Sequence, residues 1–297
     1  MRRSTTQNMQ TNIDIAKKRR RKMSEPDIHH SKLLKFQFGN AKLSKLVAHV
    51  SLPSGYTCPF AKDCLTYANK KTRKIIGKGL VYCYAATMEA RYPAYRDIVW
   101  HNFDLINEVR HDEDALFKLY MDSIAMIPNA LIIRSGVSGD FYTQAQANAV
   151  MRVADALPNI LFYAYTKSVP FFAEHLDYFG RVRKNFIVTC SLGGKHDDMV
   201  LRRGFRYARI VKNKEEADSL GLECDHDDTH AMKPGSSFAQ LVHGVQPAGS
   251  EWGKHARKNG YNKSKKDPLI EVITHNIWKE VIHGSSRSQE QRAVLAR

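Results

Sequence analysis

The stretch Ala130-Leu131-Ile132-Ile133-Arg134 decides the fold class, because it opens a repeated alternation of apolar runs and amphipathic segments. A short apolar run of this kind predicts a strand that is buried on both faces. Apolar residues at helical spacing then predict a helix over 143–157. The alternation continues downstream, and it predicts further strands at 159–165, 185–190, 206–211 and 238–243, with helices at 170–178, 197–203 and 214–220.

Strands that alternate with helices in this way predict a parallel sheet and an α/β fold. Five such units in series favour a TIM-like parallel α/β barrel or incomplete barrel, and an open doubly wound sheet is the alternative. Both architectures bind ligands at the carboxyl ends of their strands. The residues that follow each predicted strand are therefore the first candidates for a functional site.

The composition favours some classes of partner and argues against others. The chain has 297 residues, with 46 Lys and Arg against 30 Asp and Glu, and a formal net charge of +16. Such a basic chain favours a polyanionic partner, with nucleic acid as the first choice. No apolar run approaches the ~20 residues that span a bilayer, and the polar N-terminus lacks the apolar segment of a secretory signal. We therefore expect no membrane partner and a cytosolic location.

The excess positive charge is concentrated at the two ends of the chain. Residues 1–31 hold eight Lys and Arg against three acidic residues, and 251–297 hold ten against five. Clustered like charge with little apolar surface predicts a disordered basic arm over 1–31. We expect a single α/β domain over 32–284, with a cysteine-bearing loop region at about 50–90, and a C-terminal tail over 285–297. The basic ends either contact nucleic-acid phosphates or form solvated tails.

Polar and glycine-rich loops follow four of the predicted strands. Glycine lets the backbone approach a ligand closely, and N–H groups at the start of the next helix favour an anion. The same residues can instead form ordinary turns and helix caps. Because four such loops converge at one edge of the sheet, we favour a binding site, with these candidates for binding a ligand or anion: Arg134, Ser138, Gly139, Ser168, Gly193, Gly194 and Gln246.

Three further side chains at the strand ends are candidates for catalysis. Asp140 could act as a base or a ligand, Lys167 could hold a phosphate or carboxylate, and His243 could transfer a proton. A buried structural pair between Arg134 and Asp140 is the alternative interpretation.

Three cysteines precede these loops with the spacing Cys-x5-Cys-x18-Cys, at Cys58, Cys64 and Cys83. Thiolates on a loop rich in glycine and proline suit zinc or an iron–sulfur cluster, because a loop can wrap around the ion. Three ordinary cysteines, one of them buried as a small apolar residue, are the alternative.

A second group of potential metal ligands lies near the end of the predicted sheet. Cys224 could supply a fourth thiolate to the first three, or it could form a separate site with His226 and His230. The acidic residues between them fit an exposed loop equally well.

Seven short motifs, taken in order, resemble the bacteriophage gene product 88 family over about residues 35–262. They are Gly39-Asn40-Ala41-Lys42-Leu43, Leu52-Pro53-Ser54-Gly55-Tyr56-Thr57-Cys58-Pro59, Cys83-Tyr84-Ala85, Ser138-Gly139-Asp140-Phe141, Tyr165-Thr166-Lys167-Ser168, Ser191-Leu192-Gly193-Gly194 and His243-Gly244-Val245-Gln246-Pro247-Ala248-Gly249-Ser250. The resemblance implies a phage origin and a location in the host cytoplasm. It implies no particular reaction, because the members of this family are largely without an assigned activity.

A more remote resemblance is to phage proteins related to radical-SAM barrels, in which Cys-Tyr-Ala closes a cluster-binding loop. It implies that Cys58, Cys64 and Cys83 are ligands of an iron–sulfur cluster or of zinc. This chain lacks the compact Cys-x3-Cys-x2-Cys loop of those enzymes, so the resemblance does not extend to homolytic cleavage of SAM.

Two functional hypotheses follow. The first is a phage metal-binding α/β-barrel protein that carries an iron–sulfur cluster or zinc and acts on or near nucleic acid or nucleotides. The second is a non-enzymatic phage protein that binds nucleic acid or a host or phage protein and uses its metal only for structure. A metal closed off by four protein ligands favours the second, whereas an open coordination position favours the first.

Overall fold

The structure is a computed structural model that describes residues 32–259 and 267–284. The predicted basic arm over 1–31 and the C-terminal tail over 285–297 lie outside the described residues. From Leu33 onward, the described chain belongs to one compact unit.

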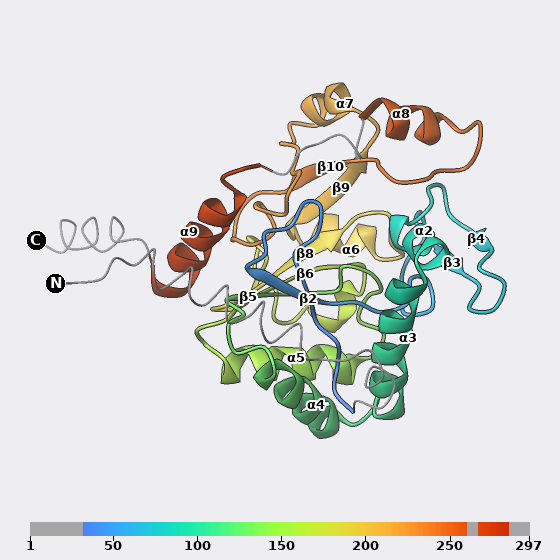
Figure 1. Cartoon of the computed structure of the whole chain (residues 1–297). Coiled ribbons are helices and arrows are strands. Elements are labelled where there is room, and N and C mark those ends of the chain that lie inside the picture. Colours follow the sequence, from blue (N-terminus) through green and yellow to red (C-terminus); the bar gives the residue numbers. More distant parts are fainter. Residues whose placement is uncertain (1–31, 260–266, 285–297) are drawn as a thin grey trace, which may run out of the picture. The chain divides into compact units, whose positions relative to one another are not determined.

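A mostly parallel central sheet organises this unit (Figure 1). Its strands, in order across the sheet, are β1 (Gln37–Phe38), β2 (Val47–Val50), β5 (Ile132–Ser135), β6 (Leu161–Thr166), β8 (Phe186–Ser191), β9 (Tyr207–Val211) and β10 (Phe238–Leu241). All neighbours from β2 to β10 are parallel, and β1 pairs antiparallel with β2. A short strand, β7 (Arg181–Arg183), pairs antiparallel with β8. The predicted α/β class with parallel pairing is therefore confirmed.

The strand order follows the chain order from β2 to β10 without a reversal. A doubly wound sheet reverses its order at a switch point, so the observed order is not of that kind. Within the described residues, however, no strand joins β10 back to β1, and closure into a barrel is not confirmed. The described part of the chain contains six parallel strands in this sheet, whereas a complete TIM barrel has eight.

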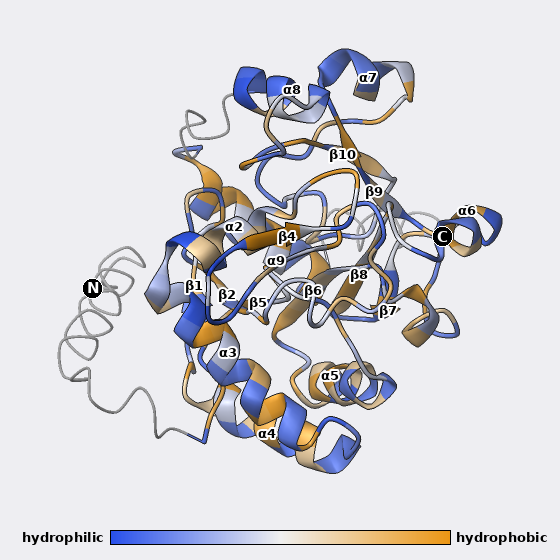
Figure 2. Ribbon diagram, turned by 90° about the vertical axis from the view of Figure 1, so that its right-hand side faces the viewer, coloured by the Kyte–Doolittle hydropathy of each residue, from blue (hydrophilic) through white to orange (hydrophobic). Residues whose placement is uncertain are grey.

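The described helices lie between and after these strands in the sequence. They are α2 (Tyr84–Arg91), α3 (Pro93–Glu108), α4 (Glu113–Ala125), α5 (Gln144–Ala156), α6 (Asp197–Arg202), α7 (Lys214–Ser219), α8 (Glu251–Asn259) and α9 (Ile270–His283). Helix α5 confirms the prediction over 143–157, and the Thr143 hydroxyl caps it by accepting the N–H of Gln146 at 3.2 Å. Helices α6 and α7 also lie where the sequence predicted them, and α7 and α8 are mostly hydrophilic (Figure 2).

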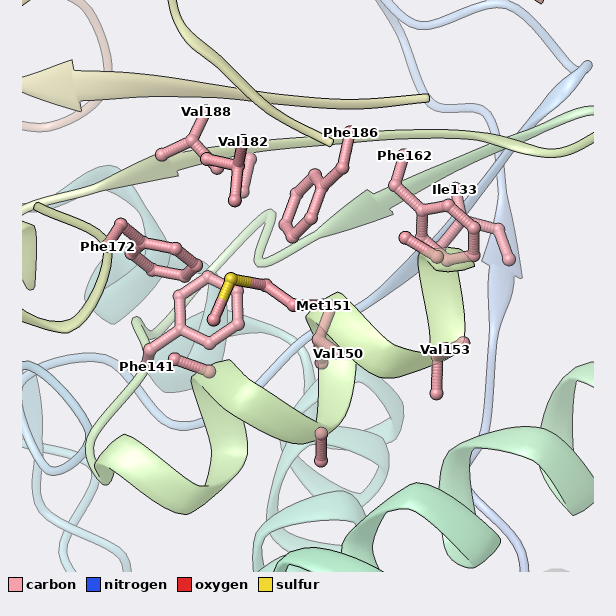
Figure 3. Close-up of a cluster of buried hydrophobic side chains, with 14 of the residues drawn as sticks. Ile133, Phe141, Val150, Met151, Val153, Phe162, Phe172, Val182, Phe186 and Val188 are labelled. Carbon is pink, nitrogen blue, oxygen red and sulfur yellow. The ribbon is translucent and has the colours of Figure 1, made fainter. Parts of the chain in front are cut away.

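The two faces of the sheet contribute to different apolar clusters. Ile133, Phe162 and Phe186 point to the face that α5 covers with Val150 and neighbouring residues (Figure 3). The alternate strand residues, such as Tyr163, belong to a second cluster that includes residues of α9. Because both faces of the strands are covered, the near-continuous apolar runs of the sequence are explained.

The prediction of a helix over 170–178 is wrong. The structure has only a 3-10 turn at Val169–Phe171, called η2, and the chain then continues irregularly. The Asp177 carboxylate accepts the backbone N–H groups of Phe179 and Arg181, at 2.9 and 2.7 Å, and thereby forms a turn. Such local side-chain bonds compete with helix formation. Phe172 is nevertheless fully buried, which explains the apolar pattern.

The segment before the predicted units contains structure that the periodicity did not indicate. The polar residue His49 interrupts the apolar run of β2, so this strand has no continuous apolar pattern. A separate two-stranded sheet pairs β3 (Thr66–Ala68) with β4 (Ile75–Gly77). This hairpin lies between Cys64 and Cys83 in the sequence, next to helix α2 (Figure 1).

Candidate functional site

A cavity of about 170 Å³ lies at the carboxyl ends of the parallel strands, where the sequence predicted a site. Residues at or directly after the ends of β5, β6, β8 and β10 line it. Residues of the segment 51–65 between β2 and β3, called the cysteine loop below, complete the lining together with residues around Cys83. The predicted residues that line this cavity are Cys58, Cys64, Cys83, Arg134, Ser138, Gly139, Asp140, Lys167, His243 and Gln246. The structure therefore brings the cysteine trio and most of the strand-end candidates to one place.

The three cysteines reach the cavity from two separate segments. Cys58 and Cys64 belong to the loop after β2, and Cys83 directly precedes α2. Burial, together with Asp140 and the other two cysteines, raises the pKa of the Cys58 thiol well above its usual value. Burial and Cys64 raise the pKa of Cys83 to about 12, although the N–H groups at the start of α2 oppose this. Without a cation beside them, the thiols of Cys58 and Cys83 are therefore protonated near neutral pH.

The donor types of the trio fit a thiophilic ion, because sulfur ligands suit zinc and iron–sulfur clusters. Across residues 32–259 and 267–284, however, no group of three or more His, Cys, Asp or Glu side chains is arranged so that it could hold a metal ion. Metal binding by the trio would therefore require these side chains to rearrange.

Asp140 connects the ends of two neighbouring strands. Its carboxylate accepts hydrogen bonds from the Thr166 hydroxyl at 2.6 Å and from the backbone N–H groups of Lys167 and Phe141 at 2.8 Å each. Burial raises the pKa of Asp140, while these donors act in the opposite direction. The arrangement holds the loops after β5 and β6 together, which is a positioning role.

Lys167 is also engaged within the protein. Its Nζ donates to the Ser191 hydroxyl at 2.6 Å and to the carbonyl oxygens of Ser191 and Leu192 at 3.2 and 3.0 Å. To bind an anion, as the sequence suggested, the ammonium group would have to leave these three acceptors at the end of β8.

His243 and Gln246 follow β10 and contact the segment around Cys83. Burial, Lys42 and Arg134 lower the pKa of His243 to about 3, so its ring is neutral at physiological pH. The ring lies 5.0 Å from that of Tyr84, measured between centroids. The Gln246 side chain accepts the N–H of Tyr82 at 2.8 Å and donates to its carbonyl at 3.0 Å. Gln246 therefore fixes the backbone beside Cys83.

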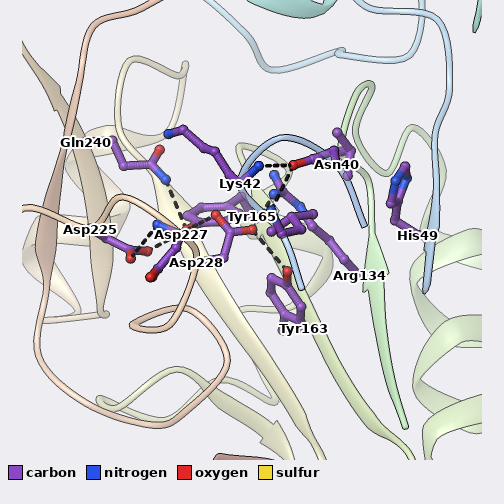
Figure 4. A network of polar contacts seen from close by, with 12 residues as sticks. Asn40, Lys42, His49, Arg134, Tyr163, Tyr165, Asp225, Asp227, Asp228 and Gln240 are labelled. Carbon is purple, nitrogen blue, oxygen red and sulfur yellow. Dashed lines mark hydrogen bonds and ion pairs between the residues drawn. The ribbon is translucent and has the colours of Figure 1, made fainter. Parts of the chain in front are cut away.

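A buried polar network, shown in Figure 4, adjoins the cavity through Arg134 and Tyr165, which also line it. Arg134 forms an ion pair with Asp228, and their side chains are only 12% and 9% exposed. Tyr163 donates to Asp228 at 3.0 Å, and Tyr165 lies with its ring 5.0 Å from the guanidinium carbon of Arg134. Burial alone would lower the pKa of Arg134, but Asp228 and the neighbouring tyrosines together outweigh burial and raise that pKa. The structural pair suggested between Arg134 and Asp140 is thus replaced by a pair with Asp228.

Comparison with known proteins places the chain in a family. A model of the family described as gene product 88 matches residues 16–264. The chain belongs to the gene product 88 family. The resemblance seen in the ordered sequence motifs is therefore confirmed. No curated protein and no solved structure matches the chain.

Other predicted site residues of this gene product 88 protein lie outside the cavity lining. The Ser168 hydroxyl is buried and donates to the carbonyl of Phe141. The N–H groups of Gly193 and Gly194 donate to the Asp197 carboxylate at 2.8 and 2.9 Å. These two donors, which the sequence suggested for an anionic ligand, are therefore used by a side chain of the protein itself. The carbonyl of Gly193 accepts the N–H groups of two residues in the cysteine loop, which attaches that loop to β8.

The second group of potential ligands is separate from the cysteine trio. Cys224 and His226 line a different, open pocket of about 470 Å³. His230 contacts the carboxylates of Glu223 and Asp225 at 3.0 and 3.4 Å. The gene product 88 protein therefore does not place Cys224 as a fourth thiolate beside the other three.

Sequence reasoning missed several members of the polar network: Lys42, Tyr163, Tyr165, Asp225 and Asp228. A signal for the two tyrosines existed, because alternate residues of a strand share a face and Tyr163 is in register with Arg134. The two aspartates lie in the stretch that the composition suggested could be an exposed loop, yet both are buried.

No helix in the described part of the chain is both long and apolar enough to cross a membrane.

Proposed function

We propose that this gene product 88 protein binds zinc or an iron–sulfur cluster through Cys58, Cys64 and Cys83, and that it acts on a nucleic acid or nucleotide at the adjoining cavity. The observation that carries this proposal is the position of the three thiols. They come from two segments of the chain and line the same cavity as the polar residues at the strand ends. In α/β folds with sequential parallel strands, this edge of the sheet is where functional sites occur.

Three thiolate ligands would leave one position of a tetrahedral zinc ion, or one iron of a cluster, open to a further ligand. When bound, such a group supplies Lewis-acid or electron-transfer chemistry. The chain's own residues would orient the further ligand. Arg134 lines the cavity, and its Nε is buried without a hydrogen-bond partner among the described residues. Arg134 therefore keeps at least this donor for an anionic group such as a phosphate.

A specific observation favours the second hypothesis, a binding protein with a structural metal. Polar groups of Asp140, Lys167 and Gln246 are engaged in hydrogen bonds within the protein. Residues that are used in this way hold loops in place and are less available for chemistry. In this alternative, the metal would only fasten the cysteine loop to the sheet.

Anaerobic purification of the full chain, followed by elemental analysis and a UV–visible spectrum, tests the proposal. Iron with labile sulfide and broad thiolate charge-transfer absorption supports a cluster protein. Zinc without iron also supports the thiolate site, and a shell closed by a fourth protein ligand would then favour the structural alternative. Protein that contains neither metal, and that takes up neither on reconstitution, would overturn the proposal.

A further inference from the structure

A strongly basic hairpin separates the second and third cysteines. It comprises residues 66–78, with strands β3 and β4, and is called the basic hairpin below. Five cationic residues lie in it, whereas no Asp or Glu occurs between residues 65 and 88. The five are Lys70, Lys71, Arg73, Lys74 and Lys78. The described chain thus carries a local excess of positive charge that does not depend on its two ends.

The cations of the basic hairpin are exposed and have no acidic partner in the part of the chain that the structure describes. All five are exposed, and none of them forms an ion pair with any described residue. Cations elsewhere differ, since Lys118, Arg202 and Lys214 each pair with an aspartate four residues along their helices. A cluster of unpaired positive charges creates a positive potential that attracts a polyanion.

The chain holds the basic hairpin in a defined position beside the cysteine loop. The Asn69 side chain accepts the N–H groups of Lys71 and Thr72 at 3.0 and 2.8 Å, which orders the turn. At the base, the buried Thr66 hydroxyl accepts the N–H of Cys83 at 3.2 Å. A side chain on Gly55 would lie 2.7 Å from the carbonyl oxygen of Thr66, so only glycine lets the cysteine loop cross here. The hairpin is therefore coupled to the cysteine-bearing segment.

Aromatic side chains lie next to these cations. The Lys70 ammonium lies 4.2 Å from the ring centroid of Trp100. Tyr56 is 44% exposed, and its ring lies 5.0 Å from that of Trp100 and 5.2 Å from that of Tyr67. Proteins that bind single-stranded nucleic acid combine cations for the backbone with aromatic rings on which bases stack.

We propose that the basic hairpin binds the phosphate backbone of single-stranded nucleic acid, with Tyr56 stacking on a base. The hairpin thereby holds the nucleic acid beside the cavity that the three cysteines line. The inference deepens the proposed function, because it names the surface that recognises the nucleic acid. The binding of nucleic acid by the hairpin does not depend on the proposed metal site. Only the action on the bound strand at the cavity rests on the proposed function. DNA and RNA present the same phosphate chemistry, so the experiment must distinguish them.

Fluorescence anisotropy with the full chain tests this surface. The probes are labelled single-stranded DNA, single-stranded RNA and duplex DNA of about 20 nucleotides, titrated between about 50 and 200 mM salt. One variant combines Lys70→Gln, Lys71→Gln, Arg73→Gln and Lys74→Gln. The matched control changes the net charge equally and combines Lys118→Gln, Arg202→Gln, Lys214→Gln and Lys279→Gln, all at exposed positions.

We expect the hairpin variant to bind the better single-stranded probe at least about tenfold more weakly, with a salt slope smaller by about three. The control should lose less than about threefold. Unchanged binding by the hairpin variant, or equal losses in both variants, would overturn the inference. Duplex DNA that binds as tightly as either single strand, or a Tyr56→Ala variant with full affinity, would overturn the stacking role of Tyr56.

Two further measurements separate this inference from the metal proposal. Arg73 adopts a backbone φ of 61°, which glycine tolerates better, so Arg73→Gly should weaken binding without lowering the melting temperature. The hairpin variant should keep the metal content of the unmodified chain, and Cys58→Ser should keep its affinity for nucleic acid. Loss of binding in Cys58→Ser would contradict the independence of the two sites.

Discussion

Arg134 and Asp228 are charged residues whose burial depends on their contact with each other. They lie 94 residues apart in the sequence and form a buried ion pair. Removing one member of such a pair leaves an uncompensated buried charge. We expect Asp228→Ala to lower the free energy of unfolding by about 3–5 kcal/mol in chemical denaturation.

The control for this prediction is the exposed pair between Asp198 and Arg202, which lies on the surface of α6. Asp198→Ala should cost less than about 1 kcal/mol, because exposed pairs contribute little. Equal effects of the two substitutions would show that the Arg134–Asp228 pair is not buried as described.

Glu89 gives a pH-dependent prediction. It is buried, Ser54 donates to its Oε1 from both the backbone N–H and the hydroxyl, and burial raises its pKa to about 7. An acid whose pKa is higher in the folded state makes folding less favourable as the pH rises. We expect stability to fall by about 3 kcal/mol between the unfolded pKa near 4.5 and pH 7, and then to level off.

Glu89→Gln keeps an acceptor for Ser54 and removes the titration, so its stability should depend less on pH over this range. Glu108→Gln changes an exposed residue and serves as the control. Urea denaturation across pH 4.5–7 measures the difference. Parallel profiles for the unmodified chain and Glu89→Gln would show that Glu89 does not titrate as its burial implies.

Single residues also show how far the sequence could predict the site. The spacing of Cys58, Cys64 and Cys83, and the polar residues after each strand, indicated the side chains that now line one cavity. The partners of these residues could not be predicted in the same way. Asp228 reaches Arg134 only through the three-dimensional course of the loop after α7, which no local pattern encodes.

At the scale of elements, Asn185 fixes the end of helix α5. Its side-chain Nδ2 is buried and lies within 2.9–3.1 Å of the carbonyl oxygens of Ala154, Leu157 and Ile160. The carbonyls of Ala154 and Leu157 also accept the backbone N–H groups of Leu157 and Ile160, so the buried Asn185 amide reinforces the turn that ends the helix. We expect Asn185→Ala to destabilise the fold by about 1–3 kcal/mol in thermal or chemical unfolding.

The neighbouring Lys184→Ala is the control, because Lys184 is exposed. It should change stability by less than about 0.5 kcal/mol. A cost for Asn185→Ala as small as this would mean that water or another donor replaces its hydrogen bonds.

Elements with strong periodicity were predictable from sequence, whereas elements fixed by local competition were not. Strands β5, β6 and β8 lie within two residues of the predicted positions, because their apolar runs are buried on both faces. The segment 170–178 shares the apolar spacing of a helix, but the turn made by Asp177 and the packing of Phe172 override it. Barrel closure is a property of the whole sheet and is not encoded in any one strand.

At the scale of the whole molecule, the cysteine loop is attached to the sheet. The N–H groups of Lys62 and Asp63 donate to the carbonyl of Gly193 at 3.1 and 2.9 Å, and the N–H of Lys195 donates to the carbonyl of Phe60 at 2.8 Å. A metal held by this loop and Cys83 should therefore stabilise the entire unit, since ligands that bind only the folded state stabilise it.

We expect removal of the metal by a chelator to lower the melting temperature of the unmodified chain by about 5–10 °C. The same treatment should leave the melting temperature of a Cys58→Ser variant unchanged. Differential scanning calorimetry provides both values. A chelator effect of the same size in both proteins would place the stabilising metal elsewhere in the chain.

The central claim is that Cys58, Cys64 and Cys83 hold a metal beside the strand-end cavity. The most direct measurement is the metal-to-chain ratio of three anaerobically purified proteins, namely the unmodified chain, Cys58→Ser and Cys224→Ser. Cys224 is the matched control because it lies in a separate pocket. The account predicts that Cys224→Ser keeps the ratio of the unmodified chain and that Cys58→Ser loses most of its metal. Full metal in Cys58→Ser, or an equal loss in both variants, would contradict it.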